Sequence, residues 1–188
     1  MKQDRKSEIV HIAAQLFKEK GYSAVTVRDI AQAMDIKAAS LYNHIKSKQE
    51  ILVLIIIAIA EEFTQNMSQI VNSQENTIQK LEKIIQLHID ITLRDDNLLA
   101  CLNNDWMHLE NENLHYFLKM REDYEQNFRK IVKTGIANQE IKNLNPEVII
   151  FSMLSTLRTL YLWYGKKKTI NGKVLKSNMI QVLLTGIV

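Results

Sequence analysis

The chain has 188 residues, of which 46% are hydrophobic and 24% are charged, and its formal net charge is +3. It is long enough for one or two small domains with a true core, so no disulfide or metal staple is needed. Cys101 is the one cysteine, so an internal disulfide framework is excluded and a reducing compartment is expected.

Turn-forming residues are scarce, with one proline and five glycines, and an all-α fold is the simplest prediction. The N-terminus lacks the apolar core of a signal peptide. The longest apolar run, Ile51 to Ala60, is about half as long as a bilayer span requires. We therefore expect a cytoplasmic protein with no membrane contact.

The chain is organised around the stretch from Thr26 to Ile45. A first helix, predicted to run from Ser7 to Gly21, precedes it. Thr26, followed three residues later by Asp29, is an N-cap pattern that opens a short helix. After a break at Asp35, a second apolar stripe opens at Leu41. This spacing predicts a helix-turn-helix.

The second of these helices has a small, polar leading end and a basic, aromatic flank. Such a helix suits the DNA major groove, where its N-terminal residues reach base edges and its flank holds phosphates. Residues 1–48 also contain nine Lys or Arg against five Asp or Glu, whereas the remainder contains fifteen against sixteen. The basic excess therefore lies in the module expected to meet DNA.

The run KGYSAVTVRDIAQAMDIKAASLYNHIKSKQEIL, Lys20 to Leu52, resembles the DNA-binding domain of the TetR family of transcriptional regulators. The resemblance rests on the turn glycine, the cap threonine and the apolar and polar positions that follow in order: Gly21, Thr26, Ile30, Ala31, Leu41, Tyr42, His44, Lys48, Glu50, Ile51 and Leu52. The family usually has Ser, Gly and Phe where this chain has Lys37, Ala39 and Ile45. Losing the Ser weakens the helix cap by about 1 kcal/mol and leaves the operator sequence open.

The resemblance implies ten DNA-contacting residues, position by position. Phosphate contacts are expected from Thr26, Arg28, Lys37, Tyr42, His44 and Lys48, and base contacts from Ala38, Ala39, Ser40 and Asn43. Asn43 can read adenine with two hydrogen bonds. Lys48 also lies beside a helix N-terminus, whose free N–H groups and dipole favour an anion.

Six further helices are predicted after the first three, which gives about nine. They cover approximately residues 47–70, 78–94, 98–109, 112–139, 146–164 and 174–187. Ser47 with Glu50 reads as a capping box, and Asn145-Pro146-Glu147 is a strong helix start. Gly165 with Lys166, Lys167 and Lys168 is expected to close the eighth helix through a left-handed cap and its dipole.

Two domains are expected: residues 1–48 form the three-helix helix-turn-helix domain and residues 49–188 form a helical domain for ligand binding and dimerisation. The apolar helix that starts at Ser47 connects them. The last two helices carry more apolar surface than one subunit can cover, which predicts a homodimer with a four-helix interface and a palindromic operator.

No enzyme, metal or cofactor is predicted. The chain has no glycine-rich phosphate loop and no nucleophile elbow. His108 and His115 are seven residues apart, but a helix break is expected between them, so they are interpreted as partly exposed histidines.

A ligand pocket is expected in the second domain, where aromatic and isolated polar residues interrupt apolar helices. Its candidate lining is His88, Thr92, Trp106, Tyr124, Arg158 and Tyr161; plain core packing is the alternative for each. Arg158 departs furthest from that alternative, since a cation in an apolar helix must find a carboxylate, a ligand anion or a partner subunit.

The favoured hypothesis is a homodimeric repressor that a small, largely apolar or acyl-type effector releases from its operator. The alternatives are a regulator whose ligand promotes DNA binding and a helical small-molecule or acyl-chain binding protein. A helical enzyme is a weaker hypothesis, because it requires a catalytic constellation that the chain does not contain.

Overall fold

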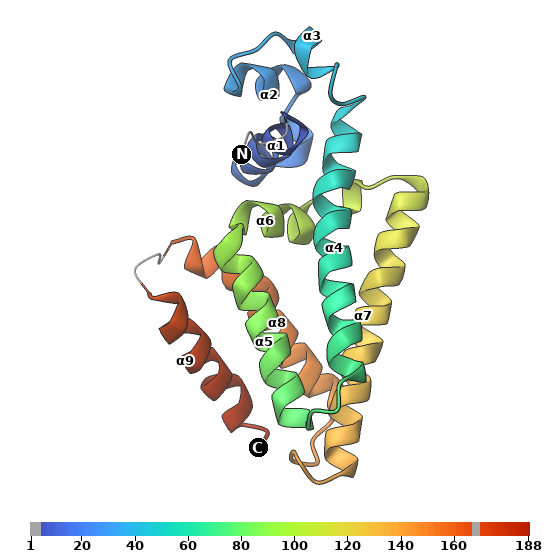
Figure 1. Ribbon diagram of the computed structural model, residues 1–188, viewed down its shortest axis with the longest axis vertical. Helices are drawn as coiled ribbons and strands as arrows, with labels where there is room; N and C mark the ends of the chain where they lie inside the picture. Colours follow the sequence, from blue (N-terminus) through green and yellow to red (C-terminus); the bar gives the residue numbers. More distant parts are fainter. Residues whose placement is uncertain (1–4, 167–169) are drawn as a thin grey trace. The chain divides into compact units, whose positions relative to one another are not determined.

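The computed structural model describes residues 5–166 and 170–188, which form nine α-helices, two short 3-10 helices and no strand (Figure 1). The all-α prediction and the expected number of helices are confirmed; Lys167 and Lys168 lie outside the described residues. The elements are α1 (Arg5–Lys20), η1 (Tyr22–Ala24), α2 (Val27–Ala33), α3 (Ala38–Leu41), α4 (Lys48–Asn72), α5 (Thr77–Arg94), α6 (Asp96–Asn104), η2 (Trp106–His108), α7 (Asn111–Ala137), α8 (Pro146–Tyr164) and α9 (Gly172–Thr185).

The helices form two compact units. The first contains the chain up to Glu61 together with Asn97–Leu118, and the second contains Glu62–Asp96 and Lys119–Val188. The chain therefore passes between the units within α4, after α5 and within α7. The domain boundary expected between residues 48 and 49 stays a prediction.

The core of the first unit holds the helix-turn-helix. α1 packs against η1 and α2, and α2 packs against α3. α1, α2, α3 and the segment after α3 contribute apolar side chains that are fully or almost fully buried, among them Ile9, Phe17, Ile30, Leu41 and Ile45. Gly21 ends α1 with φ 81°, a left-handed conformation that glycine adopts at little cost. The helix end predicted there is confirmed.

α4 carries the apolar run from Ile51 to Ala60. By length and composition it is the single described helix that is apolar enough to cross a membrane. Four of its side chains in the first unit are almost completely buried in the protein: Ile51, Leu52, Ile55 and Ile56. This burial identifies α4 as a core helix.

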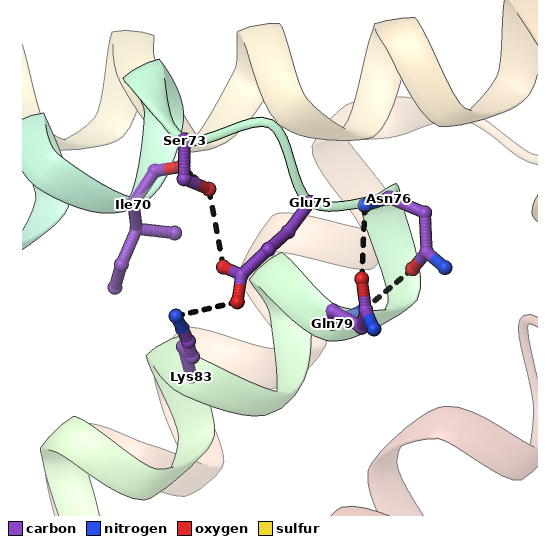
Figure 2. A network of polar contacts seen from close by, with 6 residues as sticks. All are labelled: Ile70, Ser73, Glu75, Asn76, Gln79 and Lys83. Atoms are coloured by element: carbon purple, nitrogen blue, oxygen red, sulfur yellow. Dashed lines mark hydrogen bonds and ion pairs between the residues drawn. The ribbon is translucent and has the colours of Figure 1, made fainter.

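A network of polar contacts closes the turn between α4 and α5 (Figure 2). The Ser73 hydroxyl is 2.9 Å from the Ile70 carbonyl oxygen and 3.1 Å from Glu75 Oε2. Glu75 also pairs with Lys83, in the second turn of α5, at 2.6 Å. Asn76 and Gln79 form a reciprocal capping box that starts α5. The polar break predicted here is thus a defined turn.

In the second unit, α5 packs against α8 and α9 (Figure 1). The N-terminus of α5 lies so close to α7 that a Cβ atom at Gly135 would be 2.4 Å from Thr77 Cγ2. The Thr77 N–H donates to Glu140 Oε2 at 2.5 Å, just after α7. Gly135 is therefore required for close helix packing.

Several predicted helix ends differ in the structure. α3 is four residues long and the chain continues as a turn over residues 42–44, so the buried Ile45 lies outside the helix. The helix expected over 98–109 breaks at Asp105 into α6 and η2. Gly165 has φ −54°, so the left-handed cap predicted there is wrong. Local periodicity does not register the break at Asp105 because the apolar residues Trp106 and Met107 follow it directly.

The capping box predicted before α4 is formed in part, and the cap predicted before α8 is formed in full. The Glu50 N–H donates to Ser47 Oγ at 3.0 Å, but the Glu50 carboxylate accepts the N–H of Lys46 instead of that of Ser47. Before α8, the Asn145 side chain accepts the Glu147 N–H at 2.9 Å, and proline occupies the first turn. The helix start predicted at Asn145 is confirmed.

Candidate functional site

The helix-turn-helix begins at a reciprocal capping box. Thr26 Oγ1 accepts the Asp29 N–H at 3.2 Å, and the Asp29 carboxylate accepts the Thr26 N–H at 2.7 Å and its hydroxyl at 2.6 Å. These bonds from Thr26 lower the pKa of Asp29. The predicted N-cap is confirmed. The hydroxyl of Thr26 would have to leave Asp29 before it could donate to a phosphate, and a phosphate contact there stays a prediction.

α3 is anchored from behind by apolar side chains. Leu41 is fully buried and Ile45 is 2% exposed, so the segment that joins them is held against the core of the first unit. Lys37 stands at the N-cap and makes no side-chain capping bond, as expected for a lysine where serine is usual. The anchored segment then presents its other side chains outward.

Eight of the ten predicted DNA contacts are exposed. They are Thr26, Arg28, Lys37, Ala39, Ser40, Tyr42, Asn43 and His44, whereas Ala38 and Lys48 are half-buried. Seven residues of α2, α3 and their turn line an open hollow of about 490 Å³: Arg28, Ala31, Gln32, Asp35, Ile36, Lys37 and Ala38. Its two cations, from the start of α2 and the start of α3, flank the same surface.

Lys48 is tied into the protein. Its ammonium group donates to the carbonyl oxygens of Tyr22, at 2.9 Å, and Val25, at 2.8 Å. It also lies 4.1 Å from the centre of the Tyr22 ring, a cation–π distance. Lys48 therefore braces η1 against α4, and one N–H remains for the predicted phosphate.

Tyr22 is the centre of a cluster that sequence reasoning missed. Its hydroxyl donates to Gln49 Oε1 at 2.8 Å, and its ring stacks on that of His108 with centroids 5.1 Å apart. Its N–H donates to Asp105 Oδ1 at 3.4 Å. Gln49 Nε2 in turn donates to the His108 carbonyl oxygen at 3.1 Å.

The cluster joins η1, the first turn of α4 and η2 within the first unit. Burial, reinforced by the charges of Glu110 and Asp105, raises the pKa of Tyr22. Burial also raises the pKa of the Asp105 carboxyl, against the opposing effects of the Tyr22 N–H and of His108. No local signal marks this cluster, because Tyr22 and Asp105 are 83 residues apart.

In the second unit, two of the six predicted pocket residues, His88 and Tyr124, form one buried group with Phe63. His88 Nε2 and the Tyr124 hydroxyl are 2.9 Å apart, and both rings contact Phe63 of α4. Burial, with a smaller contribution from the charge of Arg158, lowers the pKa of His88 to about 3. Burial likewise raises the pKa of Tyr124. His88 is therefore neutral, and with Tyr124 it forms a polar pair among apolar side chains.

The other predicted pocket residues have different surroundings. Thr92 is buried, and its hydroxyl donates to the His88 carbonyl oxygen at 2.8 Å, within α5. Tyr161 is buried in the second unit. Arg158 pairs with the Glu125 carboxylate of α7 at 2.8 Å, which is one of the three kinds of partner that the sequence left open. Trp106 belongs to the first unit, where it stacks on Phe117 at 5.7 Å.

α8 and α9 carry a large exposed apolar face. Phe151 is 73% exposed and Val182 is 72% exposed. Further exposed apolar side chains on the two helices are Val148, Leu162, Trp163 and Val174, and small exposed residues, Ser152, Ser155 and Thr159, lie between them on α8. Exposed apolar faces of this kind mark interaction surfaces.

Two family models match the chain. "Bacterial regulatory proteins, tetR family" matches residues 9–55, and "Tetracyclin repressor-like, C-terminal domain" matches residues 74–187. The HTH-type transcriptional repressor KstR2 of Rhodococcus jostii (strain RHA1) is 23% identical over 188 residues, 99% of this chain and 92% of that protein.

Two solved structures share the fold over nearly the whole chain. The ketosteroid transcriptional regulator KstR2 of Mycobacterium tuberculosis has a TM-score of 0.91 at 20% identity, covering 100% of this chain and 96% of the other. AibR in complex with isovaleryl coenzyme A and operator DNA has a TM-score of 0.80 at 20% identity, covering 95% of this chain and 97% of the other.

Proposed function

The chain belongs to the tetR family of bacterial regulatory proteins and is a DNA-binding transcriptional regulator, and we propose that it is a homodimeric repressor released from a palindromic operator by a small, largely apolar ligand. The observation that carries this proposal is the outward surface of α3. Buried Leu41 and Ile45 hold that surface in place, and its polar side chains are exposed. A regulator with this role acts in the cytoplasm.

The homodimer is supported by the exposed apolar face of α8 and α9. Pairing each of these helices with its symmetry mate would bury Phe151 and Val182 in a four-helix interface. A two-fold dimer presents two copies of α3, and each would read one half-site of an inverted repeat. The palindromic operator follows from this symmetry.

The ligand is proposed to bind in the second unit, near the group formed by His88, Tyr124 and Phe63. This group places a neutral polar pair against the Phe63 ring, which suits a largely apolar molecule with a few polar atoms. One neighbour in fold, AibR, was solved with isovaleryl coenzyme A and operator DNA. An acyl chain or acyl-coenzyme A is therefore the first ligand class to test, with Arg158 as the partner for an anionic group.

Release would follow if the ligand favours an arrangement of the dimer that cannot bind DNA. α4 is the element suited to couple the two events, since it begins at Lys48 in the first unit and continues into the second, where it supplies Phe63. A ligand that prefers the incompetent arrangement by about 3 kcal/mol lowers DNA affinity about a hundredfold.

The test is a gel-shift titration with DNA from upstream of the protein's own gene. We expect binding that weakens steeply with salt, because phosphate contacts release counterions. Acyl-coenzyme A compounds and apolar aromatic compounds are then titrated against the preformed complex. Release supports repression with induction, whereas tightening supports a ligand-activated binder. A chain that binds acyl ligands but no DNA would contradict the proposal.

A further inference from the structure

The side chains that α3 and its following turn expose differ from those that most often read guanine. Leu41 and Ile45 are buried in this segment. Its exposed residues are Ala39, Ser40, Tyr42, Asn43 and His44. No lysine or arginine occurs between Lys37 and Lys46. Guanine presents two acceptors, N7 and O6, and its commonest partner is a long cation that donates to both. That partner is missing from the part of the chain between these two lysines.

Asn43 has the chemistry that adenine requires. Its carboxamide carries one donor and one acceptor, which match the N7 acceptor and N6 donor of adenine in the major groove. The side chain is exposed, and its amide makes no hydrogen bond with the described residues. Its backbone is fixed, because its N–H donates to the Ser40 carbonyl oxygen at 3.3 Å and its neighbours two positions away are buried. The amide is therefore both available and positioned.

The leading end of α3 presents methyl groups. Ala39 is exposed and Ala38 is half-buried, and both lie in the first turn of the helix. Such short side chains permit close approach to the floor of the groove, where the C5-methyl group of thymine is the apolar feature to contact. Longer polar side chains would be needed to reach the edge of a G·C pair from this end.

We propose that residues 38–44 select A·T base pairs, with Asn43 reading adenine and Ala39 contacting a thymine methyl group. The inference deepens the proposed function and rests on it, since it names the DNA sequence class that the same surface binds. Asn43 and Ala39 are thus specificity-determining residues. Arg28 and Lys37, which line the hollow beside α3, hold the flanking backbone.

The test starts with selection of bound duplexes from a random pool by the full-length protein. The selected half-site should contain an A·T core. Replacing its adenine by 7-deazaadenine removes N7, and replacing its thymine by uracil removes the C5-methyl group. We expect the first change to weaken wild-type binding about tenfold and the second change to weaken it several-fold.

Two variants connect each base to its residue. Asn43→Ala should bind the adenine and 7-deazaadenine duplexes equally, and Ala39→Gly should bind the thymine and uracil duplexes equally. Lys46→Ala, an exposed lysine just after the turn, should weaken binding to the unmodified, 7-deazaadenine and uracil duplexes alike. Circular dichroism spectra matching the wild type would show that the variants are folded, as expected for exposed positions.

The outcomes separate this inference from the proposed function. Enrichment of no duplex would overturn both. A selected half-site whose core is G·C, or an adenine preference that persists in Asn43→Ala, would overturn the assignment of residues 38–44 and leave DNA binding intact.

Discussion

The ammonium group of Lys48 lies 2.9 Å from the carbonyl oxygen of Tyr22 and 4.1 Å from the centre of its ring. The Lys48 side chain therefore contacts both the backbone and the aromatic ring of Tyr22. The ammonium group also donates to the carbonyl oxygen of Val25, so Lys48 fixes the segment that leads into Thr26, the capping residue of α2.

Removing the Lys48 charge should destabilise the first unit. In Lys48→Met the aliphatic stem is largely kept, but two carbonyl groups lose a charged donor. We expect the free energy of unfolding to fall by about 1–2 kcal/mol. Urea denaturation measures this change. The control, Lys46→Met, replaces an exposed lysine and should change stability by less than about 0.5 kcal/mol. Equal stabilities of the two variants would show that the brace contributes nothing.

The same Lys48→Met variant tests the predicted phosphate contact. If the remaining N–H of the ammonium holds one phosphate, the slope of log K against log salt concentration should become shallower by about 0.9. Fluorescence anisotropy with an operator duplex at several salt concentrations gives the slope. A slope identical to that of the wild type would limit Lys48 to its structural role.

His88 should make stability depend on pH in the acidic range. Its pKa is about 3 in the folded protein, against 6.5 as its ordinary value. Between these values the unfolded chain takes up a proton that the folded protein does not, so stability is lost as pH falls from about 6.5 towards 3, by about 1.4 kcal/mol per unit.

Unfolding measured at pH 7 and pH 5 tests this expectation. Wild-type protein should lose about 2 kcal/mol more between the two conditions than His88→Gln, which lacks the titrating group. The comparison within each protein cancels any constant cost of the substitution. The same loss in both proteins would contradict a buried neutral His88.

Two glycines provide a matched test of the packing between α5 and α7. In Gly135→Ala the new methyl group would lie 2.4 Å from Thr77 Cγ2, so the helices must separate, and we expect a loss of about 1–3 kcal/mol. At Gly186 nothing lies within 4 Å of the added atom, and its φ of −74° is allowed for alanine. Gly186→Ala should therefore be neutral or stabilising by up to about 1 kcal/mol. Thermal unfolding of both variants shows whether a loss of stability comes from the contact with Thr77 or from the change in backbone freedom when glycine is replaced.

The proposed dimer interface predicts a clear effect of charge at Phe151. Phe151→Asp would place a carboxylate in the centre of the apolar face of α8, where its desolvation would oppose association. Sedimentation velocity at micromolar concentration should show a dimer for the wild type and a monomer for this variant. Met107→Asp, at an exposed apolar residue of the first unit, is the control and should remain dimeric. A monomeric wild type would contradict the interface.

Much of the helical fold could be predicted from the sequence, because its signals are local. Apolar residues at helical spacing gave the nine helices, and a side chain that bonds a backbone N–H two or three residues away marked the starts at Thr26 and Asn145. Such contacts form between neighbours in the chain, so composition and order are sufficient to predict them. The candidate DNA contacts came from the resemblance to the TetR family, and eight of the ten are exposed in the structure.

Only the tertiary structure decided the contacts between distant residues. Tyr22 meets Asp105 across 83 positions, and Arg158 finds Glu125 across 33 positions, although each of the four has several possible partners in the sequence. Trp106 was grouped with His88 as a pocket residue on composition, whereas the structure places it in the first unit beside Phe117. The physical reason is that helical periodicity defines which face of a helix is apolar, but the packing of all helices together defines which faces meet.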